Sequence, residues 1–222
     1  MARKKKENIR YIHVPNSIVQ NTEFAGLHYK EFTVYVALKI KSFNNIYQDY
    51  VEELCNRLSW AKRETVYNSL KILKQENLIQ YDYTEFPKNQ EIKIIIVQDN
   101  SHFTRLKEDT IKQIIDVVKN YKTSTSKNNK NKELHLMGIR LYYYYVKLYN
   151  SDKGYAYPSF TKINLGTGIA RGNISLLNTI FEENHILLIE HGKKTNDVNS
   201  KTNQNNKYIP LLEVDNKFQN DS

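Results

Sequence analysis

Two arginines stand in the parts of this sequence that are best suited to an anionic partner. Arg63 and Arg171 lie 108 positions apart, from 63 to 171, each near the start of a helical pattern. A planar guanidinium group can donate two hydrogen bonds to O6 and N7 of guanine, and asparagine can pair similarly with adenine. The candidate DNA-contacting residues are Lys62, Arg63, Thr65, Tyr67 and Asn68 in the first stretch, and Arg171, Gly172, Asn173 and Ser175 in the second.

Each of these side chains suits a particular contact. The methyl group of Thr65 would meet a thymine methyl group, Asn173 would pair with adenine, and Gly172 would let the backbone approach closely. The plainer alternative is that all are solvated helix positions. The recurrence of arginine at one register favours contact with bases.

The elements that would position the first cluster are two short helices joined by a tight turn. Apolar residues at helical spacing run over residues 51–58 and, after a break at 59–61, over residues 62–76. The inward positions are Val51, Leu54, Cys55 and Leu58 in the first helix, and Val66, Leu70 and Leu73 in the second. Trp60, in the turn, is predicted to fill the core. Two such helices with a hairpin behind them predict a winged helix-turn-helix, whose second helix lies in the DNA major groove.

Much of this pattern occurs twice. A shift of 108 positions, from 29 to 137, places residues 29–79 on residues 137–187 without a gap. Tyr35 then falls on Tyr143, Asn56 on Asn164, Val66 on Ile174, Leu73 on Phe181, and Leu78 on Ile186. Few identities with a shared apolar register are typical of two copies of one fold.

The flanking elements follow from the same periodicities. Helices are expected over 29–43, 108–121, 132–150 and 170–184, and strands over 9–14, 46–47, 78–83, 91–97, 155–157, 186–190 and 207–212. Lys88 would lie at the tip of the first wing, and Lys193 and Lys194 in the long insert of the second. The tetrad Tyr142–Tyr145 cannot share one helix face, so some of these rings are predicted to be exposed or to lie at an interface.

Two segments of the sequence resemble the helix-turn-helix segments of bacterial winged-helix proteins. They are NRLSWAKRETVYNSLKILKQENLI and GYAYPSFTKINLGTGIARGNISLLNTIFEENHIL. The second carries the usual lead-in, Gly154 followed by Pro158 and Ser159, which the first has lost. Two such units in one chain are similar to plasmid replication initiators and to replication-loading proteins of low-GC bacteria and their phages. Some transcription regulators share the layout.

Composition narrows the class of protein. The chain has 222 residues, 33 Lys and Arg against 24 Asp and Glu, and a net charge of +9, which favours nucleic acid as a partner. A charge spread evenly for solubility is the alternative. No metal-ligand spacing, phosphate loop or nucleophile motif is present, so we expect neither an enzyme nor a cofactor. The lone Cys55 is expected to be buried, and the lack of a long apolar run predicts a cytoplasmic protein without a membrane partner.

The sequence therefore predicts an α+β fold, mainly helical with small β-wings, built as two winged-helix domains in tandem. We expect a basic arm at 1–8, the first domain at 9–98, a helical and flexible connector at 99–132, the second domain at 133–214, and a disordered tail at 215–222. The helix at 108–121 would pack between the two domains or form a homodimer. The expected function is sequence-specific binding of double-stranded DNA in plasmid or phage replication or in transcription regulation. A protein-binding scaffold of replication loading or chromosome organisation is the alternative.

Overall fold

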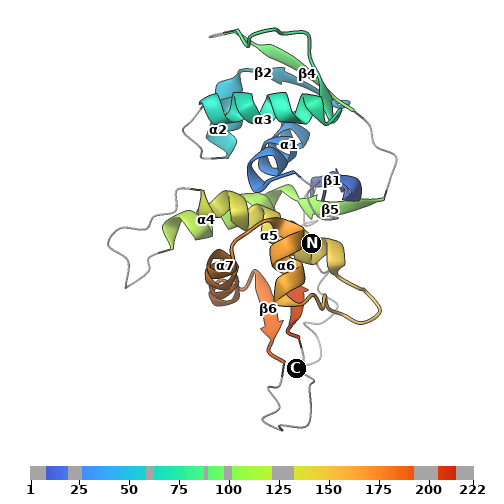
Figure 1. Ribbon diagram of the computed structural model, residues 1–222, viewed down its shortest axis with the longest axis vertical. Helices are drawn as coiled ribbons and strands as arrows, with labels where there is room; N and C mark the ends of the chain where they lie inside the picture. Colours follow the sequence, from blue (N-terminus) through green and yellow to red (C-terminus); the bar gives the residue numbers. More distant parts are fainter. Residues whose placement is uncertain are drawn as a thin grey trace, which may run out of the picture.

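The structure is a computed structural model, and it describes residues 9–19, 27–58, 63–87, 90–97, 102–121, 133–192 and 205–213. It is an α+β fold in which helices predominate and the sheets are small and antiparallel. Figure 1 shows a helical group with a sheet at the top, a second such group at the bottom, and a middle layer between them. We call residues 29–97 unit 1 and residues 134–210 unit 2.

Unit 1 has three helices and a three-stranded sheet. Its elements in chain order are α1 (Tyr29–Lys41), β2 (Ile46–Asp49), α2 (Val51–Arg57), α3 (Arg63–Gln75), β3 (Ile79–Gln80) and β4 (Ile92–Ile96). The sheet has the order β2-β4-β3, so the last strand lies between the other two. The apolar positions predicted for α2 and α3 are all buried, Cys55 among them.

Unit 2 repeats this order of elements. It contains α5 (Leu134–Leu148), α6 (Phe160–Thr167), α7 (Arg171–Glu183), β6 (Leu187–Glu190) and β7 (Lys207–Pro210). Between α5 and α6, Ala156 forms an isolated bridge with Tyr208 of β7, and β7 pairs with β6. The last strand is again flanked by the segment before the second helix and the strand after the third.

The shift of 108 positions also relates the backbone geometry of the two units. It carries the bounds of α3 onto those of α7. Asn77 and His185, which it superposes, both adopt left-handed conformations, with φ of 56° and 54°. The amide of Leu78 donates to the Leu73 carbonyl at 3.0 Å, and Ile186 donates to Phe181 at 2.8 Å. The two units therefore end their third helix with the same turn.

The middle layer contains the strand β5 (Phe103–Lys107), which the sequence patterns did not predict. β1 (Tyr11–Pro15), followed by the 3-10 helix η1 (Asn16–Val19), pairs antiparallel with β5. β5 lies within the predicted connector and leads directly into α4 (Glu108–Asn120). The apolar face of α4 is buried and α4 packs against α5, so only its polar outer face remains for the predicted homodimer, which stays a prediction.

The helix α5 forms the centre of the molecule. Every residue from His135 to Tyr145 is buried, because α1, α4, α6 and α7 all pack around this helix. No ring of the tyrosine tetrad is exposed, since Tyr144, at 9%, is the most exposed of the four. The interface alternative holds for Tyr143, whose ring centre lies 4.9 Å from that of Phe32 in α1. The hydroxyl of Tyr145 donates to Asn178 at 2.8 Å, and that of Tyr144 donates to the Lys162 carbonyl at 3.0 Å.

The two units meet through their equivalent helices, α1 and α5. The shift of 108 superposes Phe32 and Arg140, and the Arg140 guanidinium lies 4.8 Å from the centre of the Phe32 ring. Arg140 is fully buried and donates to the Gly166 carbonyl at 3.3 Å. Burial lowers the pKa of Arg140 to about 10. Arg140 thus connects α1, α5 and the last turn of α6.

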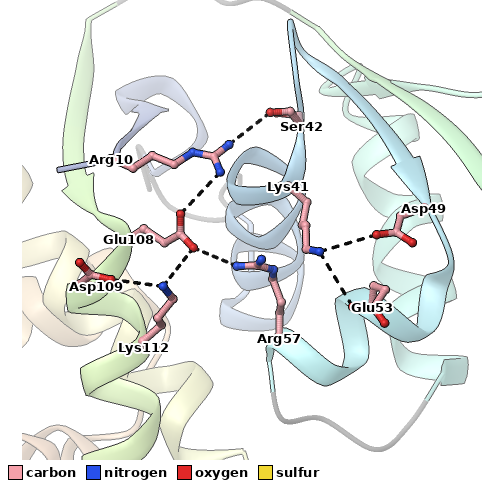
Figure 2. Close-up of polar contacts among 9 residues, drawn as sticks. All are labelled: Arg10, Lys41, Ser42, Asp49, Glu53, Arg57, Glu108, Asp109 and Lys112. Atoms are coloured by element: carbon pink, nitrogen blue, oxygen red, sulfur yellow. Dashed lines mark hydrogen bonds and ion pairs between the residues drawn. The ribbon is translucent and has the colours of Figure 1, made fainter. Parts of the chain in front are cut away.

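An ion-pair cluster around Glu108 connects the middle layer to unit 1. The Glu108 carboxylate lies 3.0 Å from a guanidinium nitrogen of Arg57, 3.3 Å from the Lys112 ammonium and 3.7 Å from a guanidinium nitrogen of Arg10 (Figure 2). The Glu108 side chain is only 12% exposed. Because its partners come from α2, from α4 itself and from the residue before β1, the cluster holds these three elements together.

Candidate nucleic-acid interface

The outer faces of α3 and α7 hold most of the candidate DNA-contacting residues that the structure describes. α3 buries Val66, Leu70 and Leu73 on its inner side, and α7 buries Ile174, Leu177 and Phe181. The first residue of each helix, Arg63 in α3 and Arg171 in α7, is exposed. Both helix starts therefore lie at the surface of the described part of the chain.

In unit 1, Arg63 forms an ion pair with Glu52 of α2. The Arg63 side chain is 48% exposed and that of Glu52 is 30% exposed. Asn68 is exposed and Thr65 is half-buried. Lys62 lies outside the described residues, as does Trp60. Glu52 had no predicted role, because its contact with α3 depends on the angle between the two helices.

Tyr67, another candidate DNA-contacting residue, packs partly against the hairpin that follows α3. Its ring is half-buried and stacks on Phe86, with ring centres 5.1 Å apart. Phe86 lies between β3 and β4 and also contacts Tyr81 and Tyr83. Burial raises the pKa of the Tyr67 hydroxyl. Tyr67 therefore fixes the hairpin against α3; the predicted tip residue, Lys88, lies outside the described residues.

In unit 2, Arg171 contacts an uncharged partner. It donates to the hydroxyl of Thr161 in α6 at 3.3 Å, and both side chains are exposed. Asn173 is half-buried and its amide lies 3.4 Å from the sulfur of Met137, whereas Ser175 is exposed. A Cβ added to Gly172 would meet no atom within 4 Å, so the packing within the chain does not require glycine there. Lys193 and Lys194 lie outside the described residues.

The turn before α7 is well defined by local contacts. The hydroxyl of Ser159 caps α6 by accepting from the Lys162 amide at 3.2 Å. Gly168 ends α6 with φ of 68°, a left-handed conformation that favours glycine. The side-chain amide of Asn164 donates to the Ile169 carbonyl at 2.7 Å and closes the turn. These contacts set the direction in which α7 begins.

Acidic residues distinguish the two surfaces. α2 carries Glu52 and Glu53 in its first turn, and α3 carries Glu64. The first turns of α6 and α7 contain no acidic residue, and Lys162 of α6 is exposed. Among the described residues, the first turns of α6 and α7 therefore offer no acidic partner to Arg171, whereas Arg63 at the start of α3 is paired with Glu52.

The titratable groups elsewhere in the described residues do not gather into a second site. No group of three His, Cys, Asp or Glu side chains there is arranged to hold a metal ion. Cys55 is buried, and desolvation raises the pKa of its thiol. His135 is buried between α5 and α2, where its Nε2 donates to the Leu58 carbonyl at 2.7 Å. Its role in the structure is to bridge two helices.

No family model, curated protein or solved structure matches this chain. In the described part of the chain, no helix combines the length and the apolar character needed to cross a membrane.

Proposed function

We propose that this protein binds double-stranded DNA through two winged-helix units in tandem, with α3 and α7 as the recognition helices. The observation that carries the proposal is the pair of exposed arginines, Arg63 and Arg171, at the first position of two helices with matching bounds. Base contacts in this class of fold come from the N-terminal residues of the recognition helix. Arginine is the commonest reader of guanine.

The arrangement of the strands supports the same proposal. In each unit a helix, a short extended segment and two further helices precede two strands, and the last strand pairs on both sides. This places a hairpin beside the third helix, where a wing would meet the sugar-phosphate backbone. The Tyr67–Phe86 stack keeps the hairpin of unit 1 in that position.

Two unlike recognition helices in one chain suit an asymmetric site. The units would contact successive major-groove faces, about one helical turn (~10 bp) apart, and each would read a different half-site. Initiation of plasmid or phage replication at iterated sites and repression of a promoter are both roles for such a protein. Sequencing the duplexes that the protein selects from a random library would define the two half-sites and the spacing between them.

The dependence of binding on salt tests the proposal. We expect the affinity for a mixed-sequence 30-bp duplex to fall steeply with salt, with a log–log slope of several units, because each phosphate contact contributes about 0.9. A slope near zero would contradict DNA binding through a cationic surface.

A protein-binding scaffold is the second candidate, and one exposed strip favours it. Phe43 is 79% exposed, and Ile46 and Ile95, opposite each other on β2 and β4, are 37% and 45% exposed. The corresponding positions for Phe43 and Ile46 in unit 2 are Ser151 and Gly154. By contrast, the tyrosine tetrad and the apolar face of α4 are buried within the chain and are not available to a partner. A flat salt response together with loss of partner binding in Phe43→Ser would favour the scaffold.

A further inference from the structure

Each of the two candidate arginines contacts a side chain of the preceding helix, but the two partners differ in charge. Arg63 is paired with the carboxylate of Glu52, and Arg171 is hydrogen-bonded to the neutral hydroxyl of Thr161. The contrast extends to the neighbouring first turns, which contain acidic residues in unit 1 and none in unit 2. The equivalent positions of Arg63 and Arg171 therefore have different electrostatic environments in the two units.

We infer that Glu52 is a specificity-determining residue that orients Arg63 and weakens its attraction to phosphates. Unit 1 then contributes sequence discrimination with little sequence-independent affinity, whereas unit 2, besides reading its own half-site, supplies most of the sequence-independent affinity for a duplex. This inference rests on the proposed function. It adds a division of labour that the repeat itself does not imply.

The chemistry of the two pairs explains the division. A guanidinium group held by a carboxylate has a fixed direction and a reduced net charge, so it gains little from a phosphate and must be matched by two acceptors on a base. A guanidinium group held by a hydroxyl keeps its full charge. It attracts the phosphates of any sequence, an interaction that salt weakens.

Glu52→Gln tests the role of the carboxylate, because it removes the charge and keeps the shape. The probes are a 30-bp duplex selected by the wild-type protein from a random library and a mixed-sequence duplex of equal length. We expect the affinity for the mixed duplex to rise about 1.4- to fivefold, the range to which the worth of an exposed ion pair converts. The salt slope should steepen by about 0.9. The preference for the selected duplex should fall about three- to tenfold, which is part of the roughly five- to 150-fold discrimination that one bidentate base contact supplies.

Glu53→Gln is the matched control. It removes the same charge from the next residue of α2, where Glu53 approaches Lys41 at 4.0 Å (Figure 2). The ion pair of Arg63 is with Glu52 and not with Glu53. We expect less than a twofold change on either duplex. Equal effects of Glu52→Gln and Glu53→Gln would overturn the inference, because bulk charge alone would then explain them.

The reciprocal change in unit 2 is Thr161→Glu, which places a carboxylate beside Arg171. The affinity for the mixed duplex should fall about two- to fivefold and the salt slope should become about 0.9 shallower, with the neutral Thr161→Gln as control. An unchanged slope in Thr161→Glu would also overturn the inference. If the wild-type protein shows no salt-dependent binding to either duplex, the proposed function itself fails; if it binds and the variants behave like their controls, only the division of labour fails.

Discussion

The change Gly172→Ala tests separately whether glycine at this position matters for the stability of the fold and for the proposed binding of DNA. Gly172 is the second residue of α7, and an added methyl group would meet no atom within 4 Å. Alanine is favoured over glycine by about 0.8–1.0 kcal/mol in a helix interior, and we expect about half of this in the first turn. The free energy of unfolding should therefore rise by about 0.5 kcal/mol, which corresponds to a rise in Tm of about 1–2 °C.

Duplex binding should change in the opposite direction. If the first turn of α7 lies against DNA, the methyl group occupies the space of a close contact and should weaken binding by about 1–2 kcal/mol, the lower part of the range for overpacking. Fluorescence anisotropy with a selected duplex measures this, and urea denaturation measures stability. Thr179→Ala is the matched control: it is exposed two turns further along α7 and also gains helix propensity, but it should leave binding unchanged. Tight binding by Gly172→Ala would refute the placement of α7 against the duplex.

Two further predictions concern the stability of the fold. Glu108→Ala should lower the free energy of unfolding, measured by urea titration, by about 2 kcal/mol, because it leaves the partly buried Arg57 without its carboxylate partner. Asp109→Ala is the control, since the Asp109 side chain is 87% exposed, and it should cost less than about 0.5 kcal/mol. Stability should also fall as the pH drops below about 6.5, the ordinary pKa of histidine, because burial lowers the pKa of His135 in the folded chain. The unfolded chain then binds a proton that the folded chain resists. His135→Gln should flatten this part of a stability–pH profile, and an unchanged slope would show that His135 does not cause it.

Local periodicity predicted most helices and strands because their apolar faces are set by residues close in sequence. The spans expected for α3 and α7 agree with the observed helices to within one residue at each end. β5 was missed because its five residues carry little signal of their own and its partner, β1, lies about 90 residues away, as in the pair Tyr11–Lys107. Strand pairing over that distance depends on the tertiary fold.

The tyrosine tetrad and the arginine partners illustrate a second limit. Helical periodicity predicts which residues share a face, but the number of elements that surround a helix is a property of the whole fold. Tyr142–Tyr145 are all buried because α5 is enclosed on every side. In the same way, arginine at two equivalent positions was visible in the sequence, whereas its pairing with Glu52 in one unit and Thr161 in the other depends on how neighbouring helices meet.

The binding free energies of Arg63→Ala and Arg171→Ala on two duplexes test the central claim most directly. On a duplex selected by the wild-type protein, we expect each substitution to cost about 1–3 kcal/mol, and on a mixed-sequence duplex of the same length much less. This difference would establish that both helices read bases. Equal losses on the two duplexes would reduce the arginines to phosphate contacts, and no loss on either would contradict recognition of DNA by α3 and α7.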